Sequence, residues 1–140
     1  MTAPDIAILR LMVEEGFRAE LYWDERGNPT IGYGFNLLAG ITPYAARALL
    51  EAQVDELNVS LSEFPWYAGM DPVRQSVPLD MAINMGLNGV LEFTHMIAAI
   101  ERGDWPSAQT ALLDSEAARE LPERYKDLGL ILLTGQEIPP

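Results

Sequence analysis

The feature that most constrains the fold is a change from helical to strand-like periodicity near the N-terminus, marked by a glycine at position 16. Residues 5–15 carry apolar side chains at the spacing of an amphipathic helix. These side chains are Ile6, Leu9, Met12 and Val13. Gly16 predicts the end of that helix, because glycine takes the left-handed conformation that terminates helices at little cost. The helix is therefore expected to close on Glu15, where the chain changes direction.

A β-hairpin is expected directly after this helix. Residues 19–24 (AELYWD) and 30–35 (TIGYGF) are short runs rich in strand-forming side chains. Between them, the glycine-asparagine-proline run at 27–29 is typical of a turn. A hairpin of this kind would place Asp24 and Thr30 close together at its base.

The end of this helix and the base of the hairpin carry two carboxyl groups, of Glu15 and Asp24, and the hydroxyl group of Thr30. Glu15 stands at a helix C-terminus, which disfavours negative charge, so an acid there points to a chemical role. Asp24 and Thr30 flank the turn. Gly32 and Gly34 leave strand backbone open to close approach by a ligand. Cleaving a glycosidic bond needs one carboxyl group to protonate the departing oxygen and another to act on the far side of the sugar. Taken alone, a pair of such acids also occurs by chance in most proteins.

The complete motif resembles the catalytic segment of the phage-type lysozymes, glycoside hydrolase family 24. In that family a glutamate closing the first helix is followed nine positions later by aspartate and six later by threonine, as are Glu15, Asp24 and Thr30. The match includes a Glu-Gly pair, a Tyr-x-Asp run and a Thr-Ile-Gly-x-Gly run. It extends from about Ile6 to Gly135. The set is far more specific than the acids alone, and the chain is identified as a member of this family.

The resemblance implies a fold of the α+β class that is mainly α. It predicts one lysozyme-like catalytic domain over residues 1–140, with a small N-terminal sheet formed by the hairpin at 19–35. An N-terminal lobe of about residues 1–60 and a helical C-terminal lobe of about residues 61–140 would make the fold two-lobed. A length of 140 residues and an apolar content of 49% suit a single compact domain.

The activity implied by the resemblance is hydrolysis of bacterial peptidoglycan, at the β-1,4 bond between N-acetylmuramic acid and N-acetylglucosamine. Glu15 would donate a proton to the glycosidic oxygen. Asp24 and Thr30 would hold the attacking water or stabilise the developing cation. The family is generally regarded as inverting, and neither a metal nor another cofactor is implied.

The resemblance also implies a set of substrate-binding residues. These are Tyr22, Asn36, Ile83, Asn84 and Arg124. Asn84 lies on a mostly apolar helix face with Asp80 and Met81, and its amide needs a partner that a sugar hydroxyl or acetamido group would supply. For Ile83 and Met81 a place in the core is the favoured interpretation. Arg124 would either supply a counter-charge to Glu15 or balance Glu123 on a solvated helix, and the sequence favours neither.

The rest of the chain predicts helices with clear start signals. Thr42 followed by proline begins a helix to about residue 60, and Asp71 followed by proline begins a central helix. Pro78 lies inside that central helix, where it removes a backbone hydrogen bond and is expected to kink or shorten the helix. Further expected elements are a break at 63–70, a turn at 86–89, a helix at 91–102 and helix starts at Asp104 and Pro122.

Four positions depart from the family pattern. Phe35 replaces a histidine after the second glycine of the hairpin, Ala117 replaces a tryptophan, and Asp127 replaces an arginine. The fourth is Pro78. These changes are expected to alter the walls of the substrate-binding cleft that the resemblance implies, and the stability of the domain. They leave Glu15, Asp24 and Thr30 intact.

Charge and composition exclude several other classes of protein. A net charge of −12 at pH 7 leaves no basic patch for phosphates, so nucleic-acid binding is not expected. Cysteine is absent, and the single histidine, His95, receives no role. No apolar run is long enough for membrane insertion. Residues 1–16 lack the features of a secretory signal, so synthesis in the host cytoplasm and action on the cell wall in the periplasm are expected.

The acidity is unexpected for an enzyme that acts on a polyanionic wall, because positive charge would steer it to its substrate. Delivery by a larger phage particle, or tuning for solubility, would account for it. We expect a monomer that acts on glycan strands as an endolysin or a virion-borne lysozyme.

Two other classes of protein stay open. A catalytically weak wall-binding or virion structural protein could retain the fold, but a decayed enzyme commonly loses one of its reactive groups. Glu15, Asp24 and Thr30 are all present. A helical adaptor whose acids coincide by chance is disfavoured by the complete motif.

Overall fold

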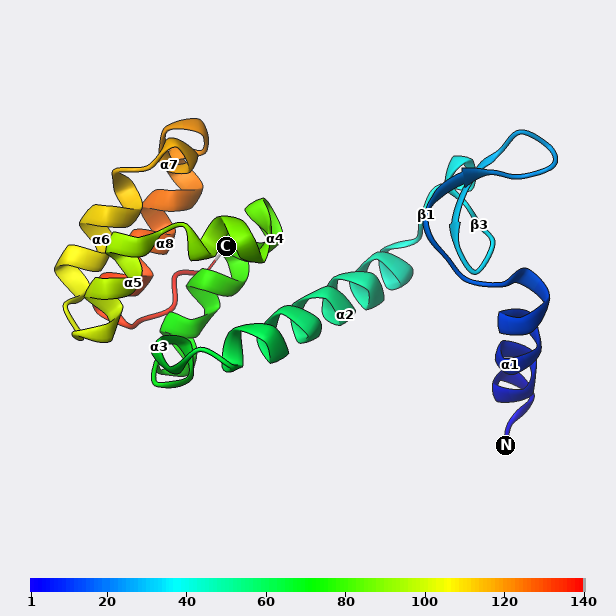
Figure 1. Ribbon diagram of the computed structural model, residues 1–140, viewed down its shortest axis with the longest axis horizontal. Coiled ribbons are helices and arrows are strands. Elements are labelled where there is room, and N and C mark those ends of the chain that lie inside the picture. The colour runs from blue at the N-terminus through cyan, green and yellow to red at the C-terminus, as the bar shows by residue number, and fades with distance from the viewer. Residues whose placement is uncertain (140) are drawn as a thin grey trace. The chain divides into compact units, whose positions relative to one another are not determined.

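Eight α-helices, one short 3-10 helix and three strands follow each other along residues 1–139, the part of the chain that the computed structural model describes (Figure 1). Their bounds are α1 (Ala3–Glu15), β1 (Arg18–Trp23), β2 (Pro29–Gly32), β3 (Phe35–Asn36), η1 (Leu37–Ala39), α2 (Pro43–Ser62), α3 (Pro65–Ala68), α4 (Pro72–Leu91), α5 (Thr94–Glu101), α6 (Trp105–Leu113), α7 (Glu116–Glu120) and α8 (Pro122–Thr134). The predicted α+β class, mainly α with a small N-terminal sheet, is confirmed.

The elements form two compact units, Met1–Ala48 and a second that begins at Leu49. The division falls within α2, as does the predicted boundary near residue 60. Each unit has its own internal structure, and the proposed reactive side chains Glu15, Asp24 and Thr30 all belong to the first.

Helix α1 has well-defined ends. The Thr2 hydroxyl accepts a hydrogen bond from the Asp5 N–H, and the Asp5 carboxylate accepts one from the Thr2 N–H, which forms a capping box. At the other end, Gly16 has φ +69° and donates its N–H to the Met12 carbonyl at 3.2 Å. The predicted end of the helix at Glu15 is therefore confirmed, and the helix starts two residues earlier than predicted because the Thr2 cap precedes the apolar pattern.

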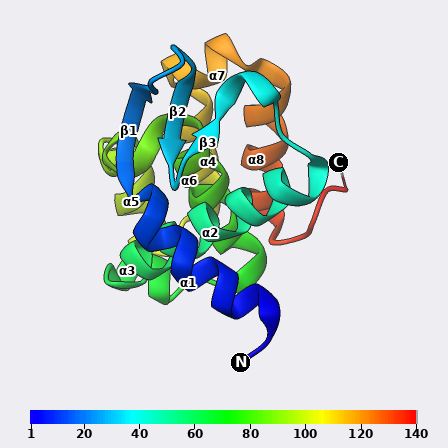
Figure 2. The ribbon, with the colours of Figure 1, turned by 90° about the vertical axis from the view of Figure 1, so that its right-hand side faces the viewer.

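The sheet is antiparallel in the order β1-β2-β3, and its strands lie side by side in Figure 2. Thr30 pairs with Tyr22 on β1 and with Asn36 on β3. The prediction of one second strand over 30–35 is wrong, because β2 ends at Gly32 and the chain turns before β3. The turn uses positive φ angles of +68° at Gly32 and +77° at Gly34, which a continuous strand of ordinary residues would not allow.

Helices α2, α4 and α6 begin at their predicted starts. Asp71 caps α4 by accepting from the Arg74 N–H at 3.0 Å, and Asp104 caps α6 by accepting from the Ser107 N–H at 3.2 Å. At the start of α2, the Thr42 hydroxyl accepts from the Ala45 N–H at 3.2 Å. Short side-chain caps of this kind act locally, which is why the sequence reveals them.

Two predictions for α4 and α5 are wrong. Pro78 neither ends nor kinks α4, which keeps helical backbone angles there and continues to Leu91. The irregularity lies instead at Gly86, with φ +81° and ψ +162°, and the chain resumes the helix directly after it. The expected turn over 86–89 is thus a kink at one residue. Helix α5 consequently starts at Thr94 rather than at residue 91.

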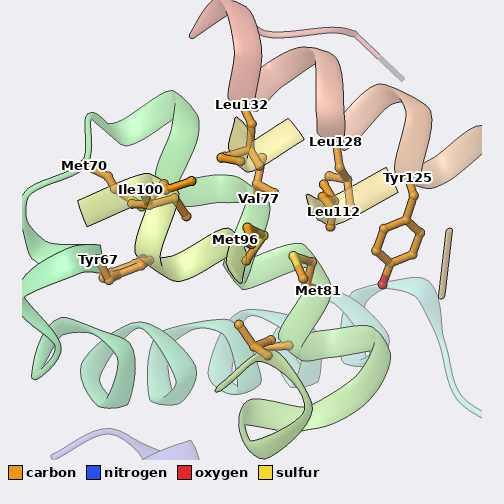
Figure 3. Packing of buried hydrophobic residues seen from close by; sticks show 14 of the residues in the cluster. Tyr67, Met70, Val77, Met81, Met96, Ile100, Leu112, Tyr125, Leu128 and Leu132 are labelled. Atoms are coloured by element: carbon orange, nitrogen blue, oxygen red, sulfur yellow. The ribbon is translucent and has the colours of Figure 1, made fainter. Parts of the chain in front are cut away.

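The core of the second unit is formed by side chains from every helix from α2 to α8, and many of them converge in Figure 3. Its largest fully buried members are Tyr67, Tyr125, Leu61, Met81, Met96, Leu112, Leu132, Val77, Val90 and Pro78. Met81 is a core residue, as favoured, and does not line a cleft. Ile83 is 39% exposed, so the core position favoured for it is wrong.

Within residues 1–139, no helix combines the length and the apolar composition that crossing a lipid bilayer requires.

Candidate active site

The carboxyl group of Glu15 lies against the backbone of Gly34, in the turn between β2 and β3. A β-carbon added to residue 34 would lie 2.6 Å from Glu15 Oε2 and 3.0 Å from Glu15 Cδ. Gly34 also has φ +77°, a backbone conformation that side-chain-bearing residues rarely adopt. Glycine at this position therefore lets the acid at the end of α1 meet the sheet.

Asp24 follows β1 and accepts three hydrogen bonds from the turn that it begins. Its Oδ1 accepts from the backbone N–H groups of Arg26 at 2.9 Å and Asn28 at 2.8 Å. Its Oδ2 accepts from Asn28 Nδ2 at 3.3 Å. The Asn28 N–H bond is the main reason that the pKa of Asp24 lies below its ordinary value, with the Asn28 amide, the Arg26 N–H and the Arg26 charge adding to it against partial desolvation. The arrangement favours an ionised carboxylate.

Thr30 is the buried polar side chain of the first unit, with 3% of its surface exposed. Its Oγ1 donates a hydrogen bond to the Asn28 carbonyl at 2.9 Å. A hydroxyl group has one proton to donate, so the remaining capacity of Oγ1 is to accept. The hydroxyl is thus fixed as an acceptor for any group that approaches it.

Tyr22 and Asn36 flank Thr30 on the neighbouring strands, as the strand register shows. Tyr22 is half-buried, and the guanidinium carbon of Arg18 lies 4.5 Å from the centre of its ring. Asn36 is exposed, and its Oδ1 accepts from the Leu38 N–H at 2.9 Å, which caps η1. The structure therefore brings these two predicted substrate-binding residues beside Thr30 within the sheet.

Asn84 in the second unit has a protein partner. The Tyr125 hydroxyl donates to Asn84 Oδ1 at 2.7 Å, and burial raises the pKa of Tyr125, which keeps that donor protonated. Asn84 and Ala117 belong to the wall of a cavity of about 600 Å³. Four acidic side chains share this wall: Glu92, Asp114, Glu116 and Glu120. His95, which received no role, lies there too.

Arg124 is paired with Asp80, not with Glu123. Its Nη2 lies 2.7 Å from Asp80 Oδ1, its Nε donates to the same oxygen at 2.8 Å, and Nη2 also donates to the Asp80 carbonyl at 3.2 Å. Both side chains are somewhat more than one third exposed. The charge of Arg124 thus has a partner within its own unit, and a role toward Glu15 stays a prediction.

Ile83 lies on the wall of a second cavity in the same unit, of about 350 Å³, which α2 and α4 form together. Its other walls are Gln53, Glu56, Leu57, Ser60 and Ala82. Two of the three predicted substrate-binding residues of the second unit therefore lie at separate cavities, with Asn84 at one and Ile83 at the other.

Asn28 is the residue of the candidate site that the sequence analysis did not single out, because its run was interpreted only as a turn. It contacts both Asp24 and Thr30. The available signal was its residue type, since asparagine in a turn commonly bonds to nearby groups. No group of three or more metal-binding side chains occurs among residues 1–139.

The fold and the candidate site define the class first. A mainly helical α+β domain, in which an acid at the end of the first helix packs on a small three-stranded sheet, is a lysozyme-like fold. Residues 13–124 match the phage lysozyme family, and the chain belongs to that family. This membership supports a lysozyme-type peptidoglycan hydrolase.

Two relatives show how this domain occurs elsewhere. The chain is 27% identical over 152 aligned residues to the pre-baseplate central spike protein Gp5 of Enterobacteria phage T4, with 87% of this chain but 26% of that protein covered. It is 24% identical over 157 residues to the probable T4-type lysozyme 1 of Dictyostelium discoideum, with 89% of this chain and 92% of that protein covered. The chain thus spans about a quarter of the phage protein and most of the amoebal one.

Proposed function

We propose that this protein is a muramidase, a glycosidase that hydrolyses the β-1,4 bond between N-acetylmuramic acid and N-acetylglucosamine in peptidoglycan. The observation that carries the proposal is the placement of two acids at one small sheet. Glu15 closes a helix against Gly34, while Asp24 is held ionised by three N–H donors. Glycoside hydrolysis requires two carboxyl groups, one to protonate the departing oxygen and one to act on the far side of the sugar.

The proposed reaction assigns one task to each reactive group. Glu15 donates its proton to the glycosidic oxygen as the bond from that oxygen to the anomeric carbon breaks. A water molecule held by Asp24 and Thr30 forms the new bond to the same carbon, and its proton passes to the Asp24 carboxylate. Thr30 suits this task because its hydroxyl proton is already committed to the Asn28 carbonyl, so that water donates to it.

The substrate contacts belong to the same proposal. Tyr22 and Asn36 lie on either side of Thr30 in the sheet and are proposed to bind the sugar nearest the reactive groups. Asn84, Ile83 and Arg124 are proposed to bind further parts of the glycan strand. Asn84 lines a cavity of about 600 Å³ and Ile83 one of about 350 Å³.

The charge distribution and the relatives bear on where the enzyme acts. From residue 49 onward there are five basic and fifteen acidic residues, a net charge of −10 out of the total of −12. A free enzyme with that charge gains nothing from attraction to an anionic wall. The similarity to a phage spike protein supports a domain that a phage particle carries to the wall, and an endolysin is the second candidate. A monomer is proposed in either case.

The test is to incubate the protein with purified peptidoglycan and to identify the sugar at each new reducing end. Borohydride reduction followed by mass spectrometry separates the two possible products. The proposal predicts reduced muramic acid, whereas reduced glucosamine would show a different glycosidase. Wall binding without any new reducing end would support the alternative, a wall-binding or virion structural protein that retains the fold.

A further inference from the structure

Asn28 joins the two groups that are proposed to hold the attacking water. Its backbone N–H and its Nδ2 donate to the two oxygens of the Asp24 carboxylate, at 2.8 and 3.3 Å. Its carbonyl accepts from Thr30 Oγ1 and from the Asp24 N–H, both at 2.9 Å. Asn28 is half-buried, so these bonds are partly shielded from competing water.

We propose that Asn28 is a positioning residue for the hydrolytic step, which sets the plane of the Asp24 carboxylate and the direction of the Thr30 hydroxyl. The proposal rests on the muramidase function proposed above. Asn28 itself touches neither the sugar nor the water, and it acts through its two neighbours.

The side-chain amide has a task that the backbone bonds do not perform. Both backbone N–H bonds end on Oδ1, so they hold one oxygen of the carboxylate and give Oδ2 no donor. The bond from Asn28 Nδ2 to Oδ2 holds the second oxygen, so both oxygens of the carboxylate have a donor that fixes their direction. With Nδ2 in place, Oδ2 keeps free lone pairs in a fixed direction, as a general base for one water molecule requires.

The backbone carbonyl of Asn28 complements this arrangement. Because Thr30 donates its proton to that carbonyl, a water molecule beside Thr30 can donate one hydrogen to Oγ1 and the other to Asp24 Oδ2. An oxygen lone pair of the water is then left free to attack the anomeric carbon. Displacement by even about 1 Å would cost about 10²-fold in rate, so small rotations of Asp24 matter.

The charged groups around Asp24 make the proposal testable by pH. Arg26, in the same turn, lowers the pKa of Asp24 by its charge and by its N–H, and the Asn28 amide adds to that effect. Glu25 is the other charged residue of the turn and is exposed. Removing the amide should raise the pKa of Asp24, and replacing it by a carboxylate should raise it further through repulsion of like charges.

The experiment compares Asn28→Ala and Asn28→Asp with the wild type and with Glu25→Ala as a matched control in the same turn. We expect about a 10- to 100-fold loss of kcat in both Asn28 variants with KM within about twofold. We also expect the acid limb of the kcat profile to move to higher pH, more in Asn28→Asp than in Asn28→Ala. Carbon-13 NMR titration of the Asp24 carboxyl group should show the same order of pKa values. Thermal unfolding identifies any variant that fails to fold.

The outcomes separate this proposal from the function on which it rests. If the wild type is active and both Asn28 variants keep its kcat and pH profile, Asn28 is only a turn residue. If kcat falls with no change in the acid limb or in the Asp24 titration, the loss comes from damage to the fold and the positioning role is wrong. A wild type that releases no muramic acid reducing ends overturns the muramidase and this proposal together.

Discussion

Replacing Gly34 by alanine is expected to have two effects, strain in the backbone at residue 34 and displacement of the Glu15 carboxyl group, the proposed proton donor. The added methyl group would lie 2.6 Å from Glu15 Oε2, whereas ordinary contacts begin at 3.4 Å, so that the oxygen must withdraw by about 0.8 Å. Because Glu15 is a flexible side chain, its movement costs little stability. The positive φ of +77° costs about 1–2 kcal/mol for an alanine. A displacement of this size at a reacting group should lower kcat by about 30- to 100-fold.

The matched control is Gly40→Ala. Gly40 has a similar φ of +74°, but a β-carbon there would meet no atom within 4 Å. Both variants should lose about 3–8 °C in melting temperature, and only Gly34→Ala should lose most of its turnover on peptidoglycan. Equal kcat losses in the two variants would show that strain alone acts, and that the position of Glu15 against Gly34 has no catalytic meaning.

Three further predictions concern the sheet, pH and salt. Thr30→Val should lower kcat far more than it raises KM, measured by release of reducing sugar, whereas the reverse would make Thr30 a binding residue. Asp5, Asp24 and Asp104 all have lowered pKa values in the folded protein. The stability that their ionised forms add is therefore present above about pH 4 and is lost as the pH falls through the lowered pKa values. Thermal unfolding between about pH 6 and 2 should show this loss, and a constant melting temperature would contradict it. Activity on intact wall should hold or rise between about 10 and 100 mM salt, because screening weakens repulsion of a −12 protein. A steep fall would reveal a local basic patch that outweighs the net charge.

Local signals predicted much of the fold. The end of α1 at Gly16 and the starts of α2, α4 and α6 each depend on one glycine or on a cap followed by proline, within a few residues of the boundary. Such signals need no knowledge of the rest of the molecule. The break between β2 and β3 was missed because positive φ at Gly32 and Gly34 can serve either a ligand or a turn, and the sequence does not separate the two.

The contacts within the candidate site were less predictable because they depend on tertiary packing. Asp80 and Arg124 are 44 positions apart in the sequence, and Asn84 and Tyr125 are 41 apart. No periodicity indicates that these residues meet. The hydrogen bonds of Asn28 are local, but their importance follows only from geometry, because an asparagine in a turn is common whether or not it serves a site.

The central claim is that Glu15 donates the proton that breaks the glycosidic bond, and the most direct test is the hydrolysis rate of Glu15→Gln on purified peptidoglycan. Glu14→Gln is the matched control, because it removes the same charge from the adjacent exposed position of α1. We predict a loss of at least about 10²-fold in kcat for Glu15→Gln, with folding and wall binding retained, and near wild-type turnover for Glu14→Gln. Turnover of Glu15→Gln within a few-fold of the wild type would contradict the claim.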